Sequence, residues 1–82
     1  MHEVTVAAGI LDAVRAEVAA QKPARAIKVG VRIGEMAGID PESLAFCFDA
    51  LVKGTDVEPL ELEIERGSAD ELEFCYLELE PT

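Results

Sequence analysis

Apolar residues recur along the chain with two spacings, one helical and one alternating. From Thr5 to about Gln21 they return every three or four residues, as expected for one face of a helix. The same spacing recurs from Pro41 to about Lys53. Ile27–Ile33 and Leu60–Glu65 instead alternate strictly between apolar and polar residues. The pattern therefore predicts two helices and two half-buried strands.

A third strand is predicted from Glu71 to Glu80, but its alternation is interrupted. Its apolar residues fall into two sets on opposite faces, with Leu72, Phe74 and Tyr76 in one set and Cys75, Leu77 and Leu79 in the other. Either a β-bulge lies near Tyr76, or the middle of the strand is covered on both sides. In the first predicted strand, by contrast, a single face takes Ile27, Val29, Val31 and Ile33.

Local signals predict where the helices begin and end. Thr5 is the expected N-cap of the first helix, and Pro23 ends it. Asp40-Pro41 begins the second helix, with Asp at the N-cap and Pro at the first helical position. Gly54 is expected to terminate that helix.

The order helix, strand, helix, strand, strand predicts an α+β fold of two layers. We expect a three-stranded mixed sheet with both helices on one face, forming a single domain over residues 1–82. The turn residues 66–70 are expected to close an antiparallel hairpin between the last two strands. Glutamates on those strands would then repel one another, and Lys28 and Arg32 could offset part of that repulsion.

The charge balance is strongly acidic, with 17 Asp and Glu residues against 7 Lys and Arg and a formal net charge of −10. Such a field repels nucleic acid and anionic membranes, so neither is expected as a partner. We find no secretory signal pattern and no apolar stretch of roughly 20 residues, and we expect a cytoplasmic protein. A monomer is expected rather than a dimer, although a short hairpin joint could favour strand exchange.

His2 is the only histidine, and its position gives it three potential nitrogen donors within two residues. The donors are the Met1 amine, the His2 amide and the His2 imidazole. They can close a five-membered and a six-membered chelate ring in one plane, with Glu3 or another backbone nitrogen as a fourth donor. Planar nitrogen ligation suits Ni(II) and Cu(II). The tripeptide alone is a weak signal for a metal site and favours an incidental histidine on a frayed terminus.

No other cluster of residues indicates chemistry. Cys47 and Cys75 are interpreted as small apolar core residues, and with one histidine they cannot complete a four-ligand zinc site. We identify no catalytic constellation, so no enzyme activity is expected. Glu3 and Asp40 are explained by helix starts and caps.

Three segments carry a resemblance to a known family. They are Met1-His2-Glu3, the run VRIGEMAGIDPESL at residues 31–44, and the run FCFDALVKGT at residues 46–55. Together they resemble the HypA/HybF family of hydrogenase nickel-incorporation proteins, over essentially the whole chain.

The resemblance implies a cytoplasmic metallochaperone that carries Ni(II) to the large subunit of [NiFe] hydrogenase, and in some bacteria to urease. The resemblance further implies that the protein acts together with a GTPase partner. It also implies that nickel is held at the N-terminus, which assigns Met1, His2 and Glu3 as the metal site.

One departure from the family is large. Typical members carry a zinc domain with two Cys-x-x-Cys pairs between the last two strands, whereas here only residues 66–70 lie between them. We therefore expect no zinc. The alternative function is a metal-free protein-interaction module of the same maturation machinery.

Overall fold

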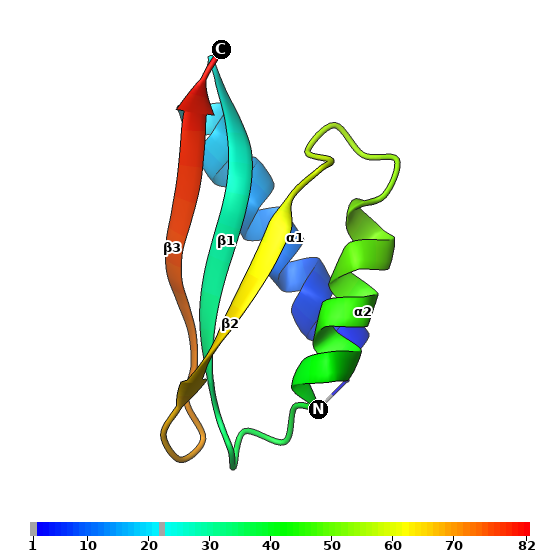
Figure 1. Cartoon of the computed structure of the whole chain (residues 1–82), viewed down its shortest axis with the longest axis vertical. Helices are drawn as coiled ribbons and strands as arrows, with labels where there is room; N and C mark the ends of the chain where they lie inside the picture. The colour runs from blue at the N-terminus through cyan, green and yellow to red at the C-terminus, as the bar shows by residue number, and fades with distance from the viewer. Residues whose placement is uncertain (1, 22) are drawn as a thin grey trace.

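The chain folds into a three-stranded sheet with both helices packed on one of its faces (Figure 1). The structure, a computed structural model, describes residues 2–21 and 23–82. In chain order its elements are α1 (Glu3–Ala20), β1 (Ala24–Gly34), α2 (Pro41–Val52), β2 (Glu61–Gly67) and β3 (Leu72–Pro81). The predicted α+β class and order of elements are confirmed.

β1 is the central strand of the sheet. It pairs in parallel with β2 and antiparallel with β3, so the sheet order is β2-β1-β3. The expected hairpin between the last two strands is therefore wrong, because β2 and β3 lie on opposite sides of β1. Electrostatics favours this order: Lys28 and Arg32 of β1 lie between two glutamate-rich strands that would otherwise be neighbours.

The connection from β2 to β3 crosses the end of β1 at Gly34. The Gly34 amide donates to the Glu71 carbonyl at 2.8 Å, and the Met36 amide donates to the Ala69 carbonyl at 2.8 Å. A Cβ atom at Gly34 would overlap the backbone of Ser68 and Ala69. Glycine at this position thus lets the crossing chain lie directly against β1.

β1 starts earlier than predicted and contains a bulge. Pairing with β3 shifts between Ala26 and Lys28, which leaves Ile27 as the extra residue. Ala26 consequently lies in the core, and Ile27 is only half-buried. The predicted inward set is correct for Val29, Val31 and Ile33 and wrong for Ile27, because the bulge reverses the alternation.

The interruption predicted in the last strand is a second bulge. Gly30 pairs with Tyr76 and Val31 pairs with Phe74, so Cys75 is the extra residue. The bulge changes the parity of the strand. Leu72 and Phe74 before the bulge and Leu77 and Leu79 after it therefore all lie on the helix side, and Tyr76 lies on the open side. The bulge prediction is confirmed. Cys75 is half-buried and lies outside the core, contrary to its interpretation as a core residue.

The caps of α2 agree with the sequence, whereas the start of α1 does not. The Asp40 side chain accepts a hydrogen bond from the Glu42 amide, Pro41 follows it, and Gly54 after the helix has a φ of +82°. In α1 the N-cap is His2, not Thr5, and the amides of Thr5 and Val6 donate to the His2 carbonyl.

The core lies between the sheet and the two helices. It is almost entirely aliphatic, and its largest fully buried side chains are Phe48, Leu44, Val14, Val29 and Val31. Cys47 packs against its margin, as its place in the apolar stripe of α2 predicts. The helices leave the opposite face of the sheet uncovered (Figure 1).

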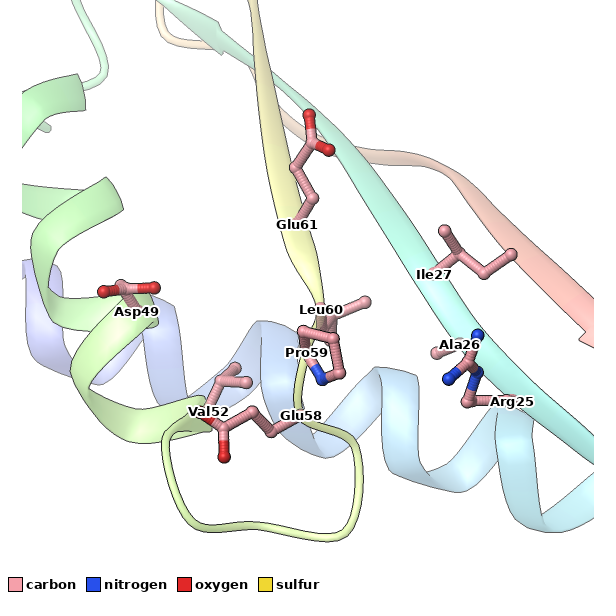
Figure 2. Close-up of a pocket in the computed structure, with 9 residues that line it drawn as sticks. All are labelled: Arg25, Ala26, Ile27, Asp49, Val52, Glu58, Pro59, Leu60 and Glu61. Atoms are coloured by element: carbon pink, nitrogen blue, oxygen red, sulfur yellow. The ribbon is translucent and has the colours of Figure 1, made fainter.

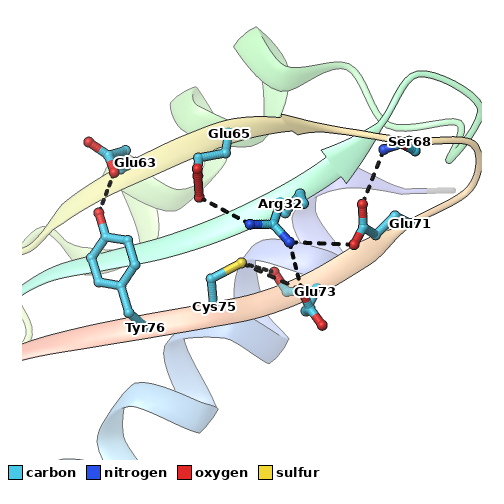
Figure 3. A network of polar contacts seen from close by, with 8 residues as sticks. All are labelled: Arg32, Glu63, Glu65, Ser68, Glu71, Glu73, Cys75 and Tyr76. Atoms are coloured by element: carbon cyan, nitrogen blue, oxygen red, sulfur yellow. Dashed lines mark hydrogen bonds and ion pairs between the residues drawn. The ribbon is translucent and has the colours of Figure 1, made fainter.

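On this uncovered face, called the open face below, cationic side chains of β1 contact carboxylates on both sides of the strand. The Arg32 guanidinium lies near three carboxylates, at 3.7 Å from Glu65, 3.7 Å from Glu71 and 3.3 Å from Glu73 (Figure 3). Lys28 lies 3.8 Å and 3.9 Å from the carboxylates of Glu61 and Glu63. The pairs join β1 to both neighbours, so they help to specify the strand order.

Candidate metal-binding site

Two of the three predicted metal ligands, His2 and Glu3, lie at the start of α1, next to the start of α2. His2 is exposed at the N-cap of α1, with φ −85° and ψ 121°, and its side chain makes no capping hydrogen bond. Its carbonyl accepts from the amides of Thr5 and Val6 at 3.1 Å and 3.2 Å. The first amides of a helix have no intrahelical acceptor, so the backbone nitrogens of His2 and Glu3 are not consumed by the helix.

Glu3 ties this segment to the body of the protein. Its Oε2 accepts a hydrogen bond from the backbone amide of Asp40 at 2.9 Å, across 37 positions of sequence. Asp40 in turn caps α2, because its side chain accepts from the Glu42 amide at 3.1 Å and from the Ser43 hydroxyl at 3.0 Å. The start of α1 is therefore held at a fixed place beside the loop that enters α2. We call this region, formed by His2, Glu3 and Asp40, the N-terminal corner.

The electrostatics of this corner favours ionised carboxylates. Both helices begin here, and each presents the positive end of its dipole. The hydrogen bond from the Asp40 amide is the main cause of the lowered pKa of the Glu3 carboxyl group. The negative charge of Glu3, next to His2 in the chain, and that of Asp40, whose amide Glu3 accepts from, offset the unfavourable effect of two helix N-termini on a cation.

The corner does not form a metal site from side chains alone. Among residues 2–21 and 23–82, no group of three or more His, Cys, Asp or Glu side chains is placed to hold a metal ion. Met1, predicted as a ligand, lies outside the described residues. Any metal held here would need backbone nitrogens, which are the donors that the chelate-ring argument supplies.

The cysteines lie on different elements, Cys47 in α2 and Cys75 in β3, and both are free. Cys75 lies in the bulge of β3, where its Sγ is 3.6 Å from the Glu73 carbonyl oxygen (Figure 3). Loss of hydration there raises the pKa of the Cys75 thiol, and the nearby Arg32 cation only partly opposes this. A protonated thiol is a poor metal ligand and a poor nucleophile, so Cys75 adds nothing to the site.

A cavity with a charged lining lies at the other end of the molecule. It has a volume of about 450 Å³ between the start of β1, the end of α2 and the segment leading into β2 (Figure 2). Its charged side chains are Arg25, Asp49, Glu58 and Glu61, and two of them are already paired: Arg25 with Glu80 and Glu61 with Lys28. No histidine or cysteine lines it.

Sequence reasoning missed the role of the Asp40 backbone. It identified Asp40 as a cap, which is correct, but the contact with Glu3 joins two segments that no local pattern connects. The available signal was the acidic residue in the first turn of α1, which local reasoning explains by the helix dipole alone.

The fold is that of a known metallochaperone class. The solution structure of the Ni metallochaperone HypA from Helicobacter pylori superposes with a TM-score of 0.74, covering 93% of this chain and 72% of that one. Sequence identity is 17%, so this likeness establishes the fold alone.

Sequence comparison establishes the family. Residues 1–76 match the family model described as hydrogenase/urease nickel incorporation, metallochaperone, hypA, and the chain belongs to this family. It is 46% identical over 69 residues to the hydrogenase maturation factor HypA of Chlorobium limicola, covering 84% of this chain and 60% of that protein. It is 46% identical over 70 residues to HypA of Methanopyrus kandleri, with coverages of 82% and 49%. The chain thus spans about half to three-fifths of these relatives.

Among the described residues, no helix is long and apolar enough to cross a membrane.

Proposed function

We propose that this chain holds Ni(II) at its N-terminus and releases it during the maturation of [NiFe] hydrogenase, with urease as a second possible client. Membership of the nickel-incorporation family supports the metal and the process. The observation that carries the proposal is the hydrogen bond between Glu3 and the Asp40 amide, because it fixes the start of α1 while His2 stays exposed.

The proposed ligands are the Met1 amine, the His2 amide nitrogen and the His2 Nδ1 atom. In a protein that begins at Met1, these three atoms form two fused chelate rings in one plane. Glu3 supplies the fourth donor through a backbone nitrogen or through the carboxylate oxygen that Asp40 does not engage. A planar set of nitrogens selects Ni(II) or Cu(II) over Zn(II), which prefers a tetrahedral site. No zinc is part of the proposal.

An exposed terminal site suits transfer by ligand exchange. A receiving protein can approach His2 from solvent and replace the donors one at a time, and the Glu3 anchor keeps the terminus in place meanwhile. The family indicates a GTPase partner and the hydrogenase large subunit as the proteins that exchange metal with this chain. We further propose that it acts in the cytoplasm, as a monomer and without enzymatic activity of its own.

A Ni(II) titration of protein with an authentic, untagged N-terminus tests the site. We expect a square-planar Ni(II) absorption band that saturates at one metal per chain. The band should disappear in His2→Ala and in protein with one residue added before Met1, since the addition converts the amine to an amide. Glu3→Gln, which keeps an acceptor for the Asp40 amide but lacks the charge, should bind nickel more weakly.

Matched controls separate ligation from folding. A tag at the C-terminus and the substitution Glu17→Gln, at the other end of α1, should leave the band unchanged. If His2→Ala binds Ni(II) as tightly as the wild type, the proposed ligand set is wrong.

The alternative of a metal-free interaction module rests on a different observation. Leu72 and Phe74 of β3 leave apolar surface exposed at the edge of the sheet, with 43% and 39% of their surface accessible. A protein that shows no nickel band but still associates with the maturation GTPase would favour this alternative.

A further inference from the structure

An open apolar groove runs between α1 and β3, far from the charged cavity of Figure 2 and distinct from the N-terminal corner. Its volume is about 320 Å³. Its apolar lining comes from one face of α1, from Val31 of β1 and from the first residues of β3, and Glu73 lies on its rim. The lining residues of α1 are Val6, Gly9, Ile10 and Ala13, and those of β3 are Leu72 and Phe74. Leu72 and Phe74 are among the few large apolar side chains that the fold leaves exposed.

The groove follows an edge of the sheet. β3 pairs with β1 on one side and with no described strand on the other, so its outer backbone edge is open to a further strand. The other edge strand, β2, has the same alternation of glutamate and apolar residues. Its Leu62 and Ile64 are half-buried against α2 and the core, however, so only the β3 edge combines an open backbone with exposed apolar surface.

Gly9 supports the interpretation that something approaches the groove from outside. It lies in the interior of α1, where glycine weakens a helix relative to almost any other residue except proline. A Cβ atom at Gly9 would meet no other atom within 4 Å, so internal packing does not require the glycine. The missing side chain at Gly9 instead leaves space in the apolar groove for a bound segment.

Charge identifies the kind of segment that fits. A strand added beside β3 would place alternate side chains on the two faces of the sheet. One set would lie in the apolar groove next to Leu72 and Phe74. The other set would lie on the open face beside the glutamates of β3, which are Glu73, Glu78 and Glu80. Glu78 makes no ion pair with another described residue, so it is available to a cation.

From this placement we propose that the α1–β3 groove binds an extended segment of a partner protein in which apolar and basic residues alternate, added as a strand to the edge of β3. A second copy of this chain does not fit. Two β3 strands side by side would bring glutamates against glutamates on the open face, and like charges across a strand pair are destabilising. The proposal does not depend on nickel binding, because no groove residue is a proposed nickel ligand.

The experiment uses a synthetic probe of the stated chemistry. A blocked peptide of roughly eight residues, about the length of an ordinary strand, alternates Val with Arg. A second peptide alternates Val with Glu and is the charge-reversed control. Backbone amide NMR shifts of the labelled protein locate the bound peptide. We expect the Val-Arg peptide to shift residues 6–13 and 72–78 and the Val-Glu peptide to shift none of them.

Gly9→Gln is the decisive variant, because it fills the groove without harming the fold. Glutamine is a better helix former than glycine, so the melting temperature should stay unchanged or rise. Affinity for the Val-Arg peptide should fall at least about tenfold, which corresponds to 1.4 kcal/mol. Ala50→Gln, the same side chain on an exposed position of α2, should leave the affinity unchanged. Glu78→Gln should weaken binding less than Gly9→Gln and should reduce its dependence on salt.

Three results would overturn the proposal. The first is equal binding of the Val-Arg peptide to wild type and Gly9→Gln, and the second is equal binding of both peptides. The third is a concentration-dependent dimer in sedimentation that Gly9→Gln dissociates, which would assign the groove to a second copy of this chain.

Discussion

On the helix-covered face of the sheet, side chains such as Val29 and Val31 are aliphatic and almost fully buried, with 0% and 1% of their surface accessible. On the open face most of the side chains are charged, and the exposed fraction of Glu61 is 68%. One strand, β1, contributes to both faces at alternate positions. The two faces therefore differ in the interactions that hold them, although the backbone is the same.

The difference separates stability from specificity. Burial of aliphatic side chains contributes roughly 25 cal/mol per Å² and is not weakened by charge screening, so the covered face supplies most of the free energy of folding. Exposed ion pairs contribute little individually. Their arrangement nevertheless favours one strand order. The cationic strand β1 lies between the acidic strands β2 and β3, and any other order would place these two acidic strands side by side.

The largest expected effect lies on the covered face, at Leu44. Its side chain is completely buried in α2, and Leu44→Ala should lower the free energy of unfolding by about 2–5 kcal/mol through lost burial and a residual cavity. Phe46→Ala, two residues along the same helix, removes more atoms from a side chain that is 77% exposed. It should change stability by less than about 0.5 kcal/mol. Urea denaturation of both variants measures the difference, and similar values would show that the two faces of α2 are not distinguished by packing.

The next effect lies on the open face, at Gly30. A Cβ atom there would overlap the ring of Tyr76, which crosses Gly30 and donates a hydrogen bond to Glu63 on β2 (Figure 3). Gly30→Val should therefore destabilise the protein by about 1–3 kcal/mol. In a Tyr76→Ala background the same substitution should be neutral or stabilising, because valine favours strands. A double-mutant cycle by urea denaturation measures this coupling. Equal destabilisation in both backgrounds would mean that the ring is not the reason for the glycine.

The sequence predicted the elements better than their arrangement. Helical and alternating spacings identified both helices and all three strands, and a parity change in β3 predicted the bulge that lies at Cys75. The bulge at Ile27 was missed because a single extra residue at the end of an alternating run leaves no visible break. Periodicity shows which side chains share a face, but it does not show which strands are neighbours. For this reason the sequence alone favoured a β2–β3 hairpin.

The candidate site was predictable only as a set of donors. The N-terminal tripeptide indicated a possible chelate, and resemblance to the family indicated the metal. The contact between Glu3 and the Asp40 amide depends on how α1 packs beside α2, which local pattern does not contain. The same holds for the groove, since the exposure of Leu72 and Phe74 follows from the position of α1 relative to the sheet edge.

A smaller effect is expected at Arg32, which lies among the carboxylates of Glu65, Glu71 and Glu73. Arg32→Gln should lower the melting temperature at about 0.01 M salt, because three carboxylates then face one another without a cation. The loss should shrink near 1 M salt, where the Debye length is only about 3 Å. Arg25→Gln is the control, since Arg25 pairs with the single carboxylate of Glu80 at 2.8 Å. Equal losses at both positions and at both salt concentrations would argue against a role for the network in the open face.

The smallest effect concerns Tyr76 and depends on pH. Its hydrogen bond to Glu63 raises the pKa of Tyr76 to about 12, whereas an unfolded tyrosine titrates near 10. Folding therefore favours the protonated phenol, and this contribution is complete below about pH 10 and is lost as the pH rises towards about 12. Tyr76 is the only tyrosine and the chain has no tryptophan, so tyrosinate absorbance reports on this residue alone. We expect a native midpoint near 12 and a midpoint near 10 in denaturant. Urea denaturation measures the free energy of unfolding of the wild type and of Tyr76→Phe between those two pH values. The variant should lack the part of the wild-type loss of stability that is due to ionisation of the phenol. A native midpoint near 10 would show that the bridge from β3 to β2 across Gly30 is too weak to hold the phenolic proton.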